Sequence, residues 1–317
     1  MSENNIPASK RMEIIRTKGR PTVKDYIPMI FDDFFELHGD RLYGDDGAIM
    51  GGVAYFKGLP VTVIAQVKGR TLEENQQCNF GMPHPEGYRK ALRLAHQAEK
   101  FHRPVICFVD TAGAFCGVEA EKRGQGEAIA RSIMEFMELK TPVISIILGE
   151  GGSGGALAMC VCDELAMLEN AVYSVISPRG FASILWKNAE REKEAADIMK
   201  ITAEDLVHLK VCDSIIKESD GGAHTDPEQT AENISEYISQ ALERNLQKGV
   251  DIISKGCILF NVVKTMYAPL AQLVEHLKRI AKANDLFRRK AAAFVLAARF
   301  LKKTAPLRQY SNDRRFV

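Results

Sequence analysis

The chain has 317 residues, of which 46% are hydrophobic and 26% are charged, and its formal net charge is +1. These values are typical of a globular protein, and the near-zero net charge argues against a general affinity for nucleic acid or membrane surfaces. No apolar run is long enough to span a bilayer, and residues 1–10 lack the apolar region of a secretory signal, so we expect a cytoplasmic protein.

The seven cysteines are scattered along the chain. Cys107 and Cys160 stand in apolar runs, where a buried, reduced thiol is the usual state. The spacing of Cys160 and Cys162 is not that of a zinc site, and no second pair completes one. The sequence therefore predicts no metal site in this chain.

In chain order, residues 1–20 are polar and basic and are expected to form a helix or an arm. Apolar residues recur at helical spacing between residues 25 and 37, which predicts one amphipathic helix. Residues 51–56 and 60–67 read as two strands joined by a turn that contains a glycine.

Helices and strands alternate from residue 85 onward. The pattern predicts a helix over 85–101, a strand over 105–109, a helix over 123–139, a strand over 143–148, a helix over 157–162, strands over 165–168 and 171–176, and a helix over 180–186. This alternation indicates an α/β fold with a covered sheet, whose site is expected at the strand ends. The composition changes near Gly249, and residues 270–283 and 286–301 again have a helical pattern.

Five glycines fall within residues 149–156, directly after an apolar strand and before a helix. Such a turn directs backbone N–H groups and a helix N-terminus toward one point, where an anion or an oxyanion can bind. Gly149, Gly151 and Gly154 also fit a dinucleotide-binding pattern, with Glu169 near the distance of its acidic partner. A tight structural turn is the third interpretation. The spacing favours the oxyanion site.

A second glycine turn, residues 110–117, follows the preceding strand. Two consecutive strands that end in glycine turns can form two walls of one pocket, although taken alone these segments are better interpreted as two ordinary loops.

Several motifs in order resemble the α subunits of the bacterial acetyl-CoA carboxylase carboxyltransferase, from about residue 20 to about residue 245. They are Glu36–Arg41, Gly51-Gly52, Lys68–Arg70, Asn79–Pro83, Pro85–Ala91, Gly149–Ala156, Tyr173–Pro178, Ala182–Lys187 and Gly221–His224. The resemblance implies a crotonase-type ββα spiral with helical N- and C-terminal additions. It divides the chain into an arm (1–20), a carboxyltransferase domain (21–248) and a C-terminal extension (249–317) that matches nothing in the family.

The resemblance also implies a reaction, namely transfer of a carboxyl group from carboxybiotin to acetyl-CoA, which gives malonyl-CoA for fatty acid biosynthesis. The chain would act only with a related β subunit, as an α2β2 assembly, and zinc is expected in that β subunit only. Carboxybiotin would arrive on the biotin carboxyl carrier protein, and ATP would be used by biotin carboxylase. No cofactor is expected to be bound covalently to this chain.

By the same resemblance, the backbone N–H groups of Gly154 and Gly155 form an oxyanion hole on the biotin side. Gly151 and Gly152 would allow close approach of the substrate, and Gly113, Ala114 and Phe115 would line the neighbouring wall. Lys68 and Arg70, which follow a strand, are candidates for binding a phosphate of coenzyme A or for facing the partner subunit. A solvated strand end is an equal alternative for both.

Four residues depart from the usual family pattern. Ala112, Phe115 and Cys116 replace Pro, Tyr and Pro in the 110–117 segment, and Arg179 replaces Glu. His84 and His224 are interpreted as structural residues. Arg89, Lys90 and Arg93 are interpreted as the solvated face of a helix.

Three other functions remain open from the sequence. The chain could belong to a related acyl-CoA carboxylase or a biotin-dependent decarboxylase. It could also be a paralogue that assembles without turnover. A hydratase or isomerase acting alone on coenzyme A thioesters would need carboxylates at the thioester site.

Overall fold

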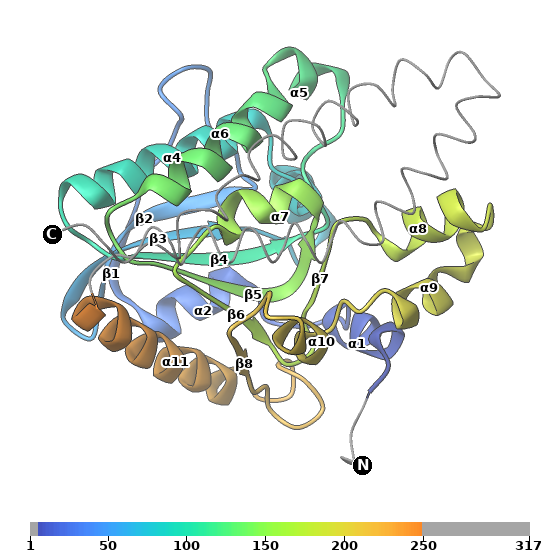
Figure 1. Ribbon diagram of the computed structural model, residues 1–317. Coiled ribbons are helices and arrows are strands. Elements are labelled where there is room, and N and C mark those ends of the chain that lie inside the picture. Colours follow the sequence, from blue (N-terminus) through green and yellow to red (C-terminus); the bar gives the residue numbers. More distant parts are fainter. Residues whose placement is uncertain (1–5, 249–317) are drawn as a thin grey trace, which may run out of the picture. The chain divides into compact units, whose positions relative to one another are not determined.

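A computed structural model describes residues 6–248, and the elements and contacts given below are those of this range. The strands are β1 (Asp32–Glu36), β2 (Ile49–Phe56), β3 (Leu59–Gln66), β4 (Val105–Thr111), β5 (Val143–Gly152), β6 (Glu164–Leu168), β7 (Val172–Ser174) and β8 (Ser214–Ile216). The α-helices are α1 (Ala8–Ile15), α2 (Val23–Ile30), α3 (Leu72–Gln77), α4 (Pro85–Lys100), α5 (Val118–Lys122), α6 (Gln125–Glu138), α7 (Ser153–Cys160), α8 (Pro178–Leu185), α9 (Glu192–Ile198), α10 (Ala203–His208) and α11 (Pro227–Lys248) (Figure 1). Short 3₁₀ helices are η1 (Asn79–Gly81) and η2 (Ala189–Arg191). The helices predicted at 270–283 and 286–301 lie outside the described residues.

One mixed sheet carries the strands in the order β1-β2-β3-β4-β5-β6-β8, and β7 pairs with the end of β5. The first three strands are antiparallel, whereas every pairing from β3 to β8 is parallel. Helices α4, α6 and α7 cover one face of the sheet, and α2 and α11 cover the other (Figure 1). Because parallel strands end at one edge, the carboxyl ends of β3, β4 and β5 lie side by side there.

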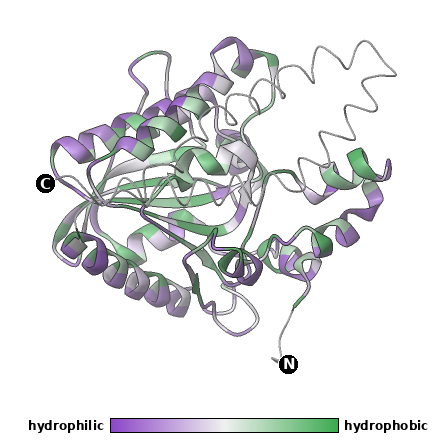
Figure 2. Ribbon diagram, in the orientation of Figure 1, coloured by the Kyte–Doolittle hydropathy of each residue, from purple (hydrophilic) through white to green (hydrophobic). Residues whose placement is uncertain are grey.

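The core lies along the central strands. β4 and β5 are buried along almost their whole length, because helices cover both faces of the sheet. Hydrophobic residues accordingly dominate these strands, while the outward faces of the covering helices are hydrophilic (Figure 2). The predicted hairpin is confirmed: β2 and β3 pair around Lys57 and Gly58, whose positive φ angles of 48° and 81° suit a tight hairpin turn.

The single helix predicted over residues 25–37 is wrong. Helix α2 ends at Ile30, and β1 follows and pairs with β2. Pro28 has no N–H to donate to the preceding helical turn, and Phe31 is already extended, with φ −121° and ψ 145°. The apolar residues that suggest a helical face therefore belong to two elements.

The basic residues of α4 are not a solvated face, which corrects the sequence-based interpretation. The loop before β2 folds over them. Arg89 Nε donates to Asp40 Oδ2 at 2.7 Å, and Arg93 Nε donates to the Gly39 carbonyl at 3.1 Å. Lys90 is 1% exposed and pairs with Asp45. A helical charge pattern alone does not reveal a loop of carboxylates that comes from elsewhere in the chain.

Cys107 and Cys160 are buried, as predicted, and burial raises the pKa of the Cys160 thiol. Within residues 6–248, no group of three or more His, Cys, Asp or Glu side chains is arranged to hold a metal ion. The same range contains no helix that is both long and apolar enough to cross a membrane.

Candidate active site at the ends of β3, β4 and β5

The elbow between β5 and α7 is sharper than the sequence pattern suggests. The strand does not stop at Leu148 but continues to Gly152, because its glycines pair with Thr111 of β4 and with β7. Helix α7 begins at the next residue, Ser153, whose φ of 52° makes the change of direction within one residue. A non-glycine residue in this conformation stores strain, which is frequent at functional sites.

The first turn of α7 presents backbone donors. Ser153, Gly154 and Gly155 are its first three residues, so their N–H groups have no acceptor four residues earlier within the helix. The residue before them, Gly152, has no side chain that could cap these groups. Unpaired N–H groups at the positive end of a helix dipole are suited to an anionic oxygen.

The two glycine segments contact each other through their backbones. A Cβ atom placed on Gly152 would lie 2.2 Å from the Ala112 carbonyl oxygen, and one on Gly155 would lie 2.5 Å from the Ala114 nitrogen. Gly113, with φ of 149°, lies in the same contact. The structure therefore brings together four of the predicted site residues, and glycine is required at 152 and 155 for this approach.

Gly154 differs from these two glycines. A Cβ atom there would meet only Ile129 Cγ2, at 3.5 Å, which is an ordinary contact. Gly151 is different again, because its neighbours are the side chains of Tyr173 and Ile147, at 2.8 and 3.2 Å from such a Cβ atom. Packing within the described residues thus explains glycine at 151, 152 and 155 but not at 154, the position where space is left beside the helix N-terminus.

A buried glutamine, which the sequence analysis missed, ties the two segments to β3. Gln66 is 1% exposed, and its Nε2 donates to the Gly155 carbonyl at 2.8 Å while its Oε1 accepts from the Asp110 N–H at 3.2 Å. The signal in the sequence was a polar residue at the end of an otherwise apolar strand. A buried amide needs hydrogen-bond partners, so such a residue indicates contacts with neighbouring backbone groups.

Charged residues meet where the three strands end. Lys68 Nζ lies 2.7 Å from Asp110 Oδ1 and 2.9 Å from Glu150 Oε2, and Arg16 NH2 lies 2.7 Å from Glu150 Oε1. Burial by itself would raise the pKa of Glu150, but Lys68 and Arg16 outweigh it and lower that pKa to about 2. Burial likewise opposes the charge of Lys68, yet the two carboxylates raise its pKa. Glu150 and Lys68 are therefore both charged at neutral pH.

The other basic candidate, Arg70, lies apart from this cluster. Its side chain is exposed and pairs with Asp25, and its N–H donates to Glu74 Oε2 at 2.7 Å. Among the described residues, no hydrogen bond or ion pair joins it to residues 149–156. Lys68 and Arg70 thus both follow the end of β3, but they do not belong to the same network of contacts.

Phe115 lies in the neighbouring wall and is half-buried. Its ring stacks on His84 with the ring centroids 4.1 Å apart, and its N–H donates to the Pro83 carbonyl at 3.0 Å. Gln125 Nε2 bridges the Phe115 and Pro83 carbonyls at 2.9 Å each. Arg123 NH2 lies 3.1 Å from His84 Nδ1, so His84 belongs to the support of this wall.

The remaining departures from the family pattern are on the surface. Ala112 and Cys116 are exposed. Arg179, in the first turn of α8, is also exposed, and its NH1 lies 3.9 Å from Glu192 Oε2. A weak, solvated ion pair of this kind contributes little to stability.

Comparison with known proteins identifies the family. Residues 3–255 match the family model described as acetyl co-enzyme A carboxylase carboxyltransferase-like. Acetyl-coenzyme A carboxylase carboxyl transferase subunit alpha of Clostridium acetobutylicum is 60% identical over 242 residues, which cover 76% of this chain and 88% of that protein. A protein of Natranaerobius thermophilus named subunits beta/alpha is 56% identical over 245 residues, which cover 77% of this chain and 39% of that longer protein.

Solved structures agree on the fold. Transcarboxylase 12S matches with a TM-score of 0.61 at 20% identity, over 79% of this chain and 47% of that one. The β subunit of P. aeruginosa geranyl-CoA carboxylase matches with a TM-score of 0.55 at 17% identity, over 75% and 45%. The chain spans about half the length of these proteins, which have the crotonase-type carboxyltransferase fold. The predicted fold class is therefore confirmed.

A family model that matches most of the sequence and a relative 60% identical to it lead to one conclusion: this chain belongs to the acetyl co-enzyme A carboxylase carboxyltransferase-like family.

Proposed function

We propose that this chain is the α half of a biotin-dependent carboxyltransferase that moves a carboxyl group from carboxybiotin to acetyl-CoA, forming malonyl-CoA. Family membership supports the reaction class. The observation that carries the site is the first turn of α7, where backbone N–H groups face a space that packing leaves open at Gly154.

The reaction requires hydrogen-bond donors for developing negative charge, and the first turn of α7 provides such donors. The N–C bond of carboxybiotin breaks, a C–C bond forms at the methyl carbon of acetyl-CoA, and the methyl proton moves to the biotin nitrogen. Negative charge develops on the ureido oxygen of biotin and on the thioester oxygen. Neither charge needs a side-chain nucleophile, and each is stabilised by two well-placed N–H donors. We assign the donors on the biotin side to Gly154 and Gly155.

The second oxyanion hole is proposed to lie on a β subunit. One relative, named subunits beta/alpha, joins both parts in one protein, which supports a β partner for this chain. An α2β2 assembly, a biotin carboxyl carrier protein, an ATP-using biotin carboxylase and zinc in the β subunit complete the proposal. Gly113, Ala114 and Phe115 are proposed to line the wall beside the biotin, and Gly151 and Gly152 to allow its approach.

Reconstitution tests this function. The full chain is purified with the β subunit encoded in the same genome, and malonyl-CoA formation is measured with carboxybiotin and acetyl-CoA. We expect turnover by the complex and none by either subunit alone. Turnover of another acyl-CoA in preference to acetyl-CoA would point to a different acyl-CoA carboxylase, and a stable complex without transfer would point to a paralogue that only assembles.

The division of the chain into residues 1–20, 21–248 and 249–317 is likewise a proposal. Limited proteolysis of the full chain, followed by mass spectrometry, should give a protected fragment that ends near residue 248. Protection that extends through residue 317 would contradict the boundary.

A further inference from the structure

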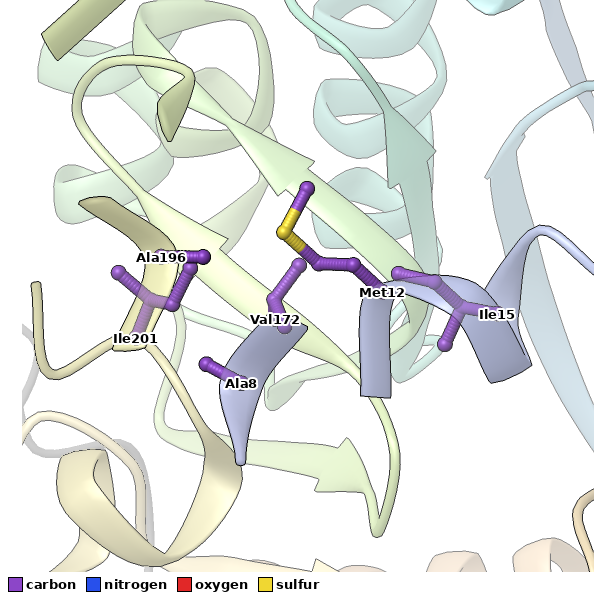
Figure 3. Close-up of a cluster of buried hydrophobic side chains, with 6 residues drawn as sticks. All are labelled: Ala8, Met12, Ile15, Val172, Ala196 and Ile201. Carbon is purple, nitrogen blue, oxygen red and sulfur yellow. The ribbon is translucent and has the colours of Figure 1, made fainter. Parts of the chain in front are cut away.

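The N-terminal segment is packed onto the fold by an apolar face. Ala8, Met12 and Ile15 of α1 point toward Val172 of β7, and the cluster continues to Ala196 and Ile201 (Figure 3). All six are buried, with at most 9% of their surface exposed. This packing places the end of α1 and the residues after it beside the carboxyl end of β5, since β7 pairs with residues 150–152.

Two arginines from this segment form hydrogen bonds to residues near the end of β5. Arg16 donates to Glu150 Oε1 from Nε at 3.0 Å and from NH2 at 2.7 Å. Arg20 donates to the Leu148 carbonyl at 2.8 Å and also forms a two-pronged pair with Glu218, at 2.7 and 2.8 Å. The side chains of Arg20 and Glu218 are 8% and 0% exposed, so this pair is buried and has to keep its geometry.

Lys68, which follows β3, contacts a carboxylate side chain of each glycine segment. Its Nζ bridges the carboxylates of Asp110 and Glu150, and Asp110 Oδ1 accepts the N–H of Glu150 at 2.9 Å. A Cβ atom on Gly149 would lie 2.9 Å from that same oxygen. The carboxylate of Asp110 therefore touches the glycine segment directly, and Lys68 fixes the carboxylate.

The charges of this cluster cancel. Lys68 and Arg16 contribute two positive charges, and Asp110 and Glu150 contribute two negative ones. A lysine held between two carboxylates is a poor attractor for a further phosphate, because both of its close partners are already anionic. This speaks against Lys68 as a ligand of coenzyme A.

We propose that Arg16, Arg20 and Lys68 are positioning residues, which fix the backbone of residues 148–155 so that the N–H groups of α7 keep their direction. The proposal rests on the function proposed above. Glycines give a backbone many accessible conformations, whereas an oxyanion hole needs donors placed to within a fraction of an ångström. The three basic side chains supply the constraint that the glycines lack.

The test uses the α–β complex and transfer in the reverse direction, from malonyl-CoA to free biocytin. The variants are Lys68→Met and Arg16→Met. The matched control is Lys10→Met, on α1, the helix that Arg16 directly follows; in the part of the chain that the structure describes, its side chain is exposed and pairs with Glu13. We expect kcat to fall by roughly tenfold to a hundredfold in both variants, with KM for malonyl-CoA within about twofold of wild type. The control should match wild type. Lys68→Arg should recover part of kcat, because it keeps the charge.

A rise in KM at unchanged kcat in Lys68→Met would overturn the proposal and return Lys68 to the role of a coenzyme A ligand. A second readout does not depend on activity, namely hydrogen exchange of the 149–156 amides in the full chain. It should accelerate in both variants by more than their loss of global stability accounts for, and not in Lys10→Met. Unchanged exchange would reject the positioning role. An inactive wild-type complex would instead reject the proposed function.

Discussion

The two glycine segments at the sheet edge touch each other, yet different forces hold them. Residues 149–156 are held by ion pairs and by backbone contacts that leave no room for a Cβ atom at Gly152 and Gly155. Asp110, the first residue of the 110–117 segment, shares in these ion pairs through Lys68, but residues 111–117 are held by neutral hydrogen bonds, such as that from Thr111 Oγ1 to the Gly81 carbonyl at 2.6 Å, and by the ring stack of Phe115 on His84.

This difference explains where the sequence can vary. Ala112 and Cys116, which depart from the family pattern, are exposed, and Phe115 keeps the aromatic ring that stacks. In the 149–156 segment, neighbouring atoms leave no room for a Cβ atom at Gly151, Gly152 and Gly155, whereas Gly154 has only Ile129 beside it. The 110–117 segment therefore has room for other side chains at Ala112 and Cys116, whereas the 149–156 segment requires the absence of a side chain at Gly152 and Gly155.

The largest effect is expected at Gly152. In Gly152→Val the new Cβ atom would overlap the Ala112 carbonyl, so one of the two segments must move. We expect the free energy of unfolding to fall by about 1–3 kcal/mol and carboxyl transfer to be lost. Urea unfolding followed by circular dichroism measures the first, and the reconstituted assay the second. An unchanged midpoint would show that the two segments are not in rigid contact.

Gly154→Val separates function from packing. A Cβ atom at this position would meet only Ile129, so the unfolding midpoint should stay close to wild type, but we expect the valine to occupy the space in front of the N–H donors. Transfer is expected to fall roughly a hundredfold.

The matched control for Gly154 is Gly126→Val. Gly126 is also the second residue of a helix that follows a glycine cap, and nothing lies within 4 Å of a Cβ atom placed on it. Equal activity losses in the two variants would remove the assignment of Gly154 to the oxyanion hole.

The ion pairs of the 149–156 segment should appear in the pH dependence of stability. Because the pKa of Glu150 is lowered from 4.5 to about 2 in the folded state, its charge stabilises the fold above pH 4.5, and this contribution is lost as the pH falls to 2. The pH-dependent advantage of wild type over Glu150→Gln should therefore reach at most about 3 kcal/mol near neutral pH and vanish as the pH falls below 2. Chemical unfolding across this range checks it, and a constant difference would contradict it.

A smaller effect is expected in the 110–117 segment. Phe115→Ala removes the stack on His84 and should cost about 1 kcal/mol of stability, while Phe115→Tyr, which restores the usual family residue, should keep the unfolding midpoint. Thermal unfolding of both variants measures this. A larger loss in Phe115→Tyr than in Phe115→Ala would mean that the hydroxyl enters a closed space.

Local patterns in the sequence determined the elements that build this edge. The turn at Lys57-Gly58, the apolar strands and the glycines before α7 are set by conformational preference and burial within short windows, so the α/β fold could be predicted and a candidate site could be placed at the end of β5. The family motifs added the reaction.

Only the tertiary structure decided which charges meet and which glycines are indispensable. Arg16 and Glu150 are 134 positions apart, and Lys68 and Glu150 are 82 apart. No local pattern encodes such a pairing, because it depends on which strands become neighbours in the sheet. The same holds for the buried face of α4, where a loop from elsewhere in the chain outweighed the local preference. Over residues 25–37, by contrast, Pro28 and the pairing of β1 with β2 together divide the window into two elements.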